Sequence, residues 1–290
     1  MLEKVSDPAS VCIAVITSYP KWYQGPLRSI KHTDKIRGDL ALETLQAARE
    51  NGYQIVCVNG LSAKTFTKEV EQIEGVHCIK RRTMKRAPGR RHAIKVAAKL
   101  AGVEIIVLTD PEKVSLLDSL PEMVAPIVSG KAEIVIPRRQ ERLFKLTYPE
   151  YMYHSEREGN KIFNEALRSQ NLLTKELEDL DSFFGPRVLR NTPPIVALFM
   201  QQFTYKIGGT FFPTSYFDPE QYSNVLFFPI VRALEKKKKV LSVEIPFSYP
   251  SLQKENETFG EQEIFIVKRN MQRLGILVNL LHFLSYLKKC

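Results

Sequence analysis

Apolar runs rich in β-branched residues alternate, in the first half of the chain, with segments whose apolar residues recur at helical spacing. The apolar runs cover residues 11–17, 54–60, 76–81, 103–109 and 132–139, and the helical segments cover residues 39–52, 63–75 and 89–102. Strands that alternate with helices predict a mostly parallel sheet covered by helices on both faces. The pattern therefore predicts an α/β fold of the Rossmann-like kind.

The pattern changes after about residue 140, where longer helical segments mix with loops rich in aromatic residues and proline. A basic run and a short strand follow over residues 235–250, and an amphipathic helix is predicted over residues 271–290. We expect residues 1–139 and 140–290 to be two halves of one merged domain, the second half forming a lid and an acceptor-binding region. The last helix is expected to dock on the core; peripheral membrane contact or pairing with another subunit is the alternative.

Composition and charge narrow the class of protein. The chain has 290 residues, of which 44% are hydrophobic, and carries a net charge of +10. This charge favours an anionic partner: a nucleotide, a phosphorylated acceptor, nucleic acid or an acidic membrane surface. The four cysteines lack metal-binding or redox spacing, there is no signal-peptide pattern, and no apolar run reaches the roughly 18 residues of a membrane span. We therefore expect a cytoplasmic protein with reduced thiols.

Polar residues follow three of the predicted strands directly. Thr17, Ser18 and Tyr19 follow the first strand, Asn59 ends the second, and residues 110–113 follow the fourth. Polar strand ends are common in α/β proteins and are often structural. Because parallel strands end at one carboxyl edge, where such sheets bind ligands, we expect these residues to gather around a site.

The stretch Asp110-Pro111-Glu112-Lys113 is the strongest candidate within that site. Proline keeps the chain extended and directs both carboxylates to one opening, where they could hold Mn²⁺ or Mg²⁺ against a diphosphate. The ammonium of Lys113 could replace part of the metal charge or bind a phosphate oxygen. The alternative is structural: Asp110 would cap a helix that has Pro111 at its first position.

A basic segment precedes this acidic stretch and leads into the third predicted helix. Basic side chains and free N–H groups at a helix start form a site for an anion, and the guanidinium fork suits phosphate. The alternative is a solvated charged face. The basic residues are Lys80, Arg81, Arg82, Lys85, Arg86, Arg90 and Arg91.

Three carboxylates in the second half are candidates for acid–base chemistry. Glu156 shares a helix face with Asn160, and Asp179 and Asp181 precede a turn containing glycine and proline. One of these carboxylates could act as a general base on an acceptor hydroxyl or hydrogen-bond the acceptor. Structural roles are the alternative for each of them.

The order of the elements over residues 11–139 resembles that of GT-A fold glycosyltransferases of the family-two type. The resemblance rests on the strand IAVITSYP, the helix LALETLQAARENGY, the strand QIVCVNGLSAKT, the basic helix APGRRHAIKVAAKLAG and the acidic end IIVLTDPEK. The P-loop, GxGxxG and GxSxG motifs are absent from the sequence, which disfavours P-loop NTPases, nicotinamide dehydrogenases and serine hydrolases.

The resemblance implies a nucleotide-sugar donor at the carboxyl edge and transfer of a hexose. Thr17, Ser18 and Tyr19 would lie near the base and ribose, and Asn59 stands where the family usually has an aspartate. Asp110 and Glu112 would correspond to the family's Asp-x-Asp motif, which implies Mn²⁺ or Mg²⁺. The remaining donor contacts are expected from Arg86, Arg90, Arg91 and Lys113, and the acceptor-side acid from Asp179 or Asp181.

Two other functions compete with this prediction. A sugar-phosphate nucleotidyltransferase would need a glycine-rich loop after the first strand, where the sequence has only Gly25. A catalytically inactive protein could instead bind a nucleotide or nucleic acid, although we expect no nucleic-acid partner. Its bases would stack on Phe183, Phe184, Phe211, Phe212, Phe227 or Phe228.

Overall fold

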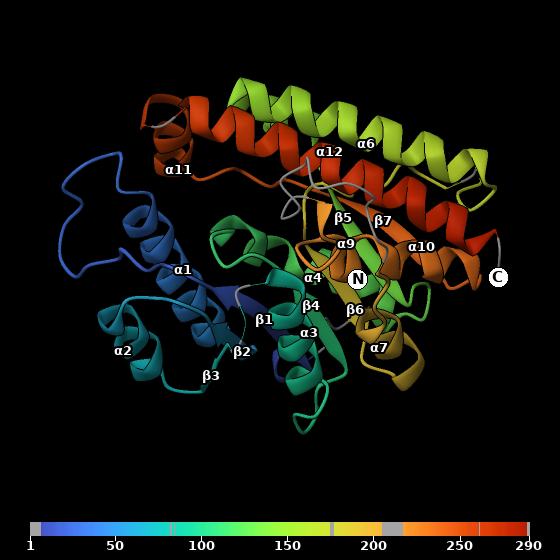
Figure 1. Ribbon diagram of the computed structural model, residues 1–290. Helices are drawn as coiled ribbons and strands as arrows, with labels where there is room; N and C mark the ends of the chain where they lie inside the picture. Colours follow the sequence, from blue (N-terminus) through green and yellow to red (C-terminus); the bar gives the residue numbers. More distant parts are fainter. Residues whose placement is uncertain are drawn as a thin grey trace.

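The computed structural model describes residues 7–81, 83, 85–174, 177–204, 217–260 and 262–288. Seven strands form one sheet in the order β3-β2-β1-β4-β6-β5-β7 (Figure 1). The strands are β1 (Val11–Thr17), β2 (Gln54–Asn59), β3 (Val76–Lys80), β4 (Ile105–Leu108), β5 (Ile134–Arg139), β6 (Arg187–Arg190) and β7 (Val240–Ile245). All five strands predicted in the first half are therefore confirmed, with ends shifted by two residues or fewer.

The sheet is parallel apart from one strand. β1 pairs in parallel with β2 and β4, β2 with β3, and β5 with β7, whereas β6 is antiparallel to both β4 and β5. The predicted α/β fold, a mostly parallel sheet flanked by helices and carrying a helical extension, is confirmed. The antiparallel strand was not predicted, because the four residues Arg187–Arg190 contain no apolar run.

Helices cover both faces of the sheet because neighbouring residues of the central strands are buried on opposite sides. Cys12, Ala14 and Ile16 pack with one hydrophobic cluster, and Val11, Ile13 and Val15 pack with the other. The first cluster includes residues of α3 (Arg86–Ala97), α7 (Pro193–Met200), α9 (Ser223–Leu226) and α10 (Phe228–Glu235). The second includes residues of α1 (Thr33–Glu50), α2 (Lys64–Gln72), α4 (Leu120–Val128) and α5 (Glu141–Thr147).

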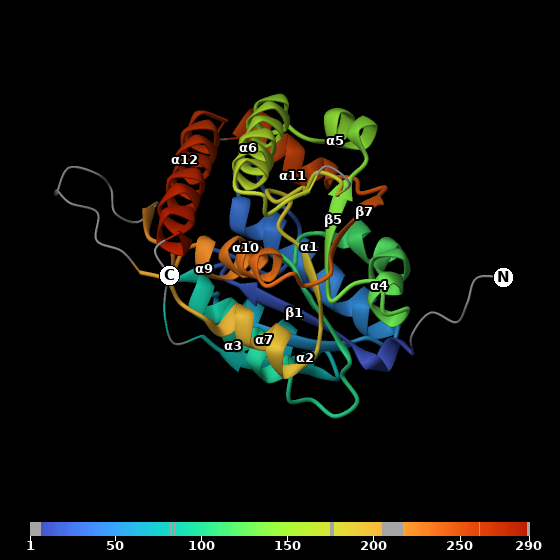
Figure 2. The same ribbon diagram turned by 90° about the vertical axis from the view of Figure 1, so that its right-hand side faces the viewer.

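Two long helices lie side by side over one end of the sheet (Figures 1 and 2). These are α6 (Glu150–Ser169) and α12 (Gln262–Leu287), and the short α11 (Ser251–Glu255) precedes α12. The predicted C-terminal helix is confirmed, although it begins nine residues earlier than expected. It buries Ile276, Leu280 and Phe283 in the core, as its docking role requires. None of the helices in the described ranges has the length and apolar character that crossing a membrane requires.

Candidate active site

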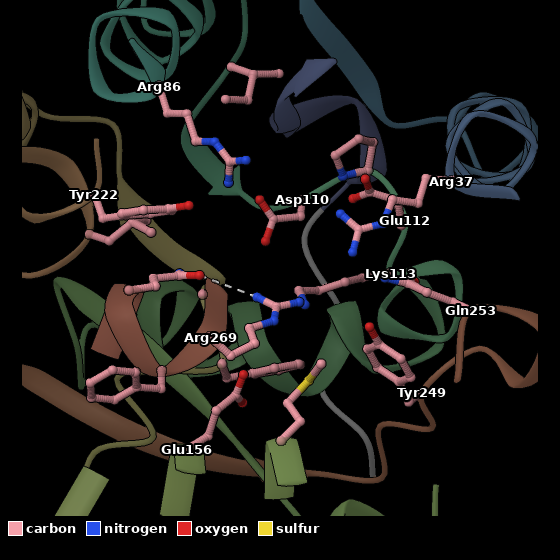
Figure 3. A pocket seen from close by; sticks show the side chains of 18 of the residues that line it. Arg37, Arg86, Asp110, Glu112, Lys113, Glu156, Tyr222, Tyr249, Gln253 and Arg269 are labelled. Atoms are coloured by element: carbon pink, nitrogen blue, oxygen red, sulfur yellow. Dashed lines mark hydrogen bonds between the residues drawn. The ribbon is translucent and has the colours of Figure 1, made fainter. Parts of the chain in front are cut away.

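A pocket of about 370 Å³ lies at the carboxyl ends of β1 and β4, beneath α6 and α12 (Figure 3). Cationic side chains outnumber carboxylates among the described residues that line it. The cations are Arg37, Arg81, Arg86, Arg90, Lys113, Lys268 and Arg269, and the carboxylates are Asp34, Asp110, Glu112 and Glu156. A pocket with this excess of positive charge is suited to an anionic ligand.

One side of the pocket, which we call the β4 wall, consists of Arg81, Arg86, Arg90, Asp110, Glu112 and Lys113. Asp110 follows β4 closely, and the next helical turn is a 3-10 helix that begins only at Val114, with Lys113 as its N-cap. The structural alternative for Asp110, an N-cap, is therefore wrong. Gly185 lies against the Asp110 carboxylate with a φ of +106°, a conformation that favours glycine.

Asp110 is held by an arginine from the start of α3. The Nη2 atom of Arg90 donates to Oδ1 of Asp110 over 2.7 Å, and the Arg90 side chain is only 5% exposed. Burial alone would raise the pKa of the Asp110 carboxyl, but the charges of Arg90 and Lys113 outweigh it and hold that pKa below its usual range. Asp110 is therefore ionised at neutral pH and fixes the position of Arg90.

Lys113 points into the pocket from the same strand end (Figure 3). Its Nζ atom lies 4.9 Å from the ring centroid of Phe184 and 5.6 Å from that of Phe247. Burial lowers the pKa of Lys113, and the attraction of Asp110 and Glu156 opposes that effect. Within the described part of the chain Lys113 forms no ion pair, so its charge is available to a ligand.

Glu112 is turned toward the end of β1. Its Oε1 atom accepts a hydrogen bond of 2.9 Å from the hydroxyl of Tyr19, whose backbone N–H donates to Ser62. Among the described residues, no three histidine, cysteine, aspartate or glutamate side chains are placed to hold a metal ion. The two predicted metal ligands thus both line the pocket, each bound to another side chain of the protein.

The other predicted donor contacts divide into two groups. Thr17, Ser18, Tyr19 and Arg86 line the pocket, and the Arg86 guanidinium lies 5.2 Å from the ring centroid of Tyr222. Asn59 and Arg91 do not line it. The Asn59 amide accepts from Thr17 and donates to Thr67, whereas Arg91 pairs with Glu220. Arg82 lies outside the described residues.

Of the three carboxylates predicted on the acceptor side, Glu156 lines the pocket. It pairs with Arg139 over 2.6 Å. Asp181 is 6% exposed and accepts from both Arg139 and Asn160. Burial would raise the pKa of Asp181, but the charge of Arg139 and these hydrogen bonds hold it below its usual range. Asp179 is 64% exposed in its side chain and pairs with Arg168. Asp181 is thus placed to position Arg139 rather than to face the pocket.

Replacing Asp181 by alanine is expected to destabilise the fold by about 3–5 kcal/mol, because it removes a partner of a buried cation. The Arg139 side chain is 0% exposed and would keep Glu156 as its only carboxylate partner among the described residues. Urea unfolding would measure the loss. Asp179→Ala is the matched control and should change the free energy of unfolding by less than about 0.5 kcal/mol. Equal stabilities of the two variants would contradict the prediction.

Only some of the phenylalanines considered for base stacking lie at the pocket. Phe183, Phe184 and Phe227 line the pocket, whereas Phe228 stacks on Phe283 in the core with ring centroids 4.2 Å apart. Phe211 and Phe212 lie outside the described residues.

A second group of cations around the pocket, which we call the α12 wall, consists of Lys268 and Arg269 from α12 with Arg37 from α1, which lies beside Glu112 (Figure 3). Sequence analysis missed it. Glu257, which is fully buried, pairs with Arg37 over 2.5 Å and with Arg269 over 3.7 Å. The only signal in the sequence is a pair of basic residues ahead of the predicted helix, and nothing in the sequence connects that pair to residue 37.

No protein-family model matches the chain, and no curated protein matches it. Solved structures do. Glucosyl-3-phosphoglycerate synthase from Mycobacterium tuberculosis, in complex with Mn²⁺, UDP and phosphoglyceric acid, aligns over 95% of this chain and 82% of its own, with 8% identity and a TM-score of 0.48. The 4-diphosphocytidyl-2C-methyl-D-erythritol synthase from Anaerococcus prevotii aligns over 91% and 98%, with 12% identity and a TM-score of 0.43. A cytidylyltransferase from Leptospira borgpetersenii aligns over 97% and 94%, with 12% identity and a TM-score of 0.41. At these identities and scores the likenesses identify neither an activity nor a substrate.

Proposed function

We propose that the protein is a glycosyltransferase that transfers a hexose from a nucleotide-diphosphate sugar to an acceptor hydroxyl. The observation that carries the proposal is the β4 wall, in which an Asp110–Arg90 pair lies beside cations that form no ion pair with a described residue, at the carboxyl edge of a mostly parallel sheet. Ligands of such sheets bind at this edge. Ser18, Tyr19 and Thr17, at the end of the neighbouring strand, are the proposed contacts to the base and ribose.

The charges of the β4 wall match a diphosphate. Four cations face two carboxylates, which leaves an excess of two positive charges. The diphosphate of a nucleotide sugar carries two negative charges. Guanidinium groups and an ammonium at this position would therefore neutralise the donor and hold it at the mouth of the sheet.

In the proposed reaction the acceptor oxygen forms a bond to the anomeric carbon of the sugar while the bond from that carbon to the diphosphate breaks. Negative charge develops on the departing diphosphate, and the cations of the β4 wall stabilise it there. Glu156, the acceptor-side carboxylate that lines the pocket, is the proposed base that takes the hydroxyl proton.

The residues at the β4 wall do not fit the expected Mn²⁺ or Mg²⁺. Such ions need several oxygen ligands, and one Asp110 oxygen is engaged by Arg90 while one Glu112 oxygen accepts from Tyr19. Lys113 adds a positive charge that would repel a metal beside Asp110. We therefore assign neutralisation of the diphosphate to Lys113 and the arginines.

Binding of nucleoside diphosphates tests the proposal without knowledge of the acceptor. A thermal-shift screen of nucleoside diphosphates and their sugars, in EDTA and in Mn²⁺, should find at least one that raises the melting temperature in EDTA. A protein that binds none of them in either condition is not a glycosyltransferase of this kind. Release of pyrophosphate from a nucleoside triphosphate would favour the nucleotidyltransferase instead.

Arg86→Gln is expected to weaken binding of the best nucleoside diphosphate about 10- to 100-fold, because a charge-assisted hydrogen bond to phosphate contributes about 1.5–3 kcal/mol. Titration calorimetry would measure the affinity. Lys85→Gln is the matched control, since its side chain is 50% exposed and pairs with Asp218. The same loss in both variants would mean that general charge, and not the pocket, binds the nucleotide.

A further inference from the structure

The α12 wall carries more positive charge than the protein itself neutralises. It holds three cations, Arg37 from α1 with Lys268 and Arg269 from α12, and the two arginines pair with one buried carboxylate, Glu257. The nearest aromatic contact of the Lys268 ammonium is the Phe265 ring, 5.9 Å away, and no ion pair within the described residues involves it. Among the described residues, one carboxylate thus lies within ion-pair distance of this group of three cations, while Glu112 and Glu156 attract Arg37 and Arg269 from farther away.

Partial burial of these three cations costs free energy unless a ligand supplies negative charge and hydrogen-bond acceptors. The side chains of Arg37 and Arg269 are 18% and 23% exposed, and the Nε atom of each is buried without a hydrogen-bond partner. Burial, together with the charges of Arg37, Arg86 and Arg269, lowers the pKa of Lys268 to about 8. Clustered cations with unused donors are stabilised by an anion that accepts their hydrogen bonds.

The donor diphosphate is proposed to be neutralised by the β4 wall at the strand ends. Lys268 and Arg269 come instead from α12, which covers the pocket. Figure 3 shows Arg86 and Asp110 on one side of the pocket, and Arg269 on the other. Glu156, the proposed base, also lines the pocket, so an acceptor held by α12 would have its hydroxyl within the same cavity.

We infer that the α12 wall binds an anionic group of the acceptor, a phosphate or a carboxylate, opposite the donor diphosphate. The inference rests on the proposed function and names the acceptor class: a hydroxyl compound that carries a negative charge. Arg37 and Arg269 would donate to the anionic oxygens, Lys268 would add charge, and Gln253 and Gln272, which also line the pocket, would contact neutral parts of the acceptor.

Sulfate is a suitable probe, because it is a dianion throughout the pH range of interest. Titration calorimetry in EDTA would measure its affinity with and without a saturating nucleoside diphosphate. We expect sulfate to bind in both cases, and at the α12 wall alone once the nucleoside diphosphate occupies the β4 wall. In the presence of the nucleoside diphosphate, Lys268→Gln/Arg269→Gln should weaken sulfate binding at least tenfold. The same double variant should change nucleoside diphosphate binding less than threefold, whereas Arg86→Gln should weaken nucleoside diphosphate binding at least tenfold and change this sulfate binding less than threefold. Lys145→Gln/Lys288→Gln removes two exposed charges elsewhere and serves as the control.

Three results would overturn the inference: loss of all sulfate binding in the presence of the saturating nucleoside diphosphate, sulfate affinity unchanged by the α12 substitutions, or equal weakening by the control. Failure of the proposed function looks different, since sulfate would bind at α12 while no nucleoside diphosphate binds anywhere. Displacement of sulfate by glucose 6-phosphate or by gluconate, compared with glucose, would separate a phosphate acceptor from a carboxylate acceptor. Displacement by glucose equal to that by both anions would also overturn the inference.

Sulfate affinity should fall about five- to tenfold as the pH rises from 7 to 9.5, because Lys268 loses its proton near pH 8. The charged groups that face Lys268 are Arg37, Arg86, Arg269 and Glu257, and all keep their charge over this range. The folded-state pKa of Lys268 is lowered, so the ammonium is present below pH 8 and is lost above it. Lys268→Gln should remove this pH dependence, and a slope that persists in the variant would assign it to another group.

Discussion

Replacing Lys113 by methionine is expected to lower turnover about 10²–10³-fold, the usual cost of losing one group that stabilises developing charge. Methionine keeps an apolar stem against Phe184 and Phe247 but removes the charge that the β4 wall offers to the diphosphate. The fold should tolerate the change, since burial lowers the pKa of Lys113 and no ion pair with a described residue is lost. Pyrophosphate binding in EDTA would be measured by calorimetry beside turnover, because pyrophosphate reports on the wall independently of base and sugar.

Lys113→Arg is the control, because it keeps the positive charge and should retain most of the pyrophosphate affinity. Removing the ammonium leaves the Asp110 carboxylate with one cation fewer beside it. Mn²⁺ should therefore restore part of the pyrophosphate affinity of Lys113→Met but add little to that of the wild type. A wild type that loses pyrophosphate binding in EDTA and regains it with Mn²⁺ would contradict the assignment of Lys113.

Glu156→Gln is expected to lower turnover about 10²–10⁴-fold, the range for loss of a general base. Glutamine keeps the size of Glu156 and one oxygen that can accept from Arg139, but it has no carboxylate to take the acceptor proton. Affinity for the nucleoside diphosphate should change little, because Glu156 lies on α6 and not on the β4 wall. The comparison of turnover with nucleotide affinity separates a role in chemistry from a role in donor binding.

Asp179→Asn is the matched control for Glu156→Gln, since the Asp179 carboxylate is exposed and pairs with Arg168. It should keep wild-type turnover. If Asp179→Asn loses activity while Glu156→Gln retains it, the acceptor-side acid is Asp179 and the assignment of Glu156 is wrong.

The sequence predicted the first half of the fold and one wall of the pocket for the same physical reason. Buried parallel strands require continuous apolar runs, and these end in polar residues at one edge, so the positions of Thr17 and Asp110 follow from their place after such runs. The basic residues before the third predicted helix could be assigned to the same edge. In a sheet of parallel strands the helix that follows each strand begins at the edge where that strand ends.

The rest could not be predicted, because it depends on contacts between distant parts of the chain. Arg37 and Arg269 meet at Glu257 only through the packing of α12 near α1. Asp181 precedes a loop in the sequence, yet its side chain is buried. Two nitrogens of Arg139 from β5 and the amide of Asn160 from α6 donate to its carboxylate. Asn59 has the polarity of a ligand contact, but Thr17 and Thr67 use both ends of its amide.

The position of the antiparallel strand β6 determines whether the first half of the chain can be produced as a separate fragment. Although residues 1–139 carry the β4 wall, β6 comes from residue 187 onward and lies between β4 and β5. A fragment ending near residue 139 would leave β4 and β5 with unpaired backbone groups along their facing edges. Exposed edges of this kind pair with other chains and aggregate, so the first half depends on a four-residue strand from the second half to keep these two edges paired.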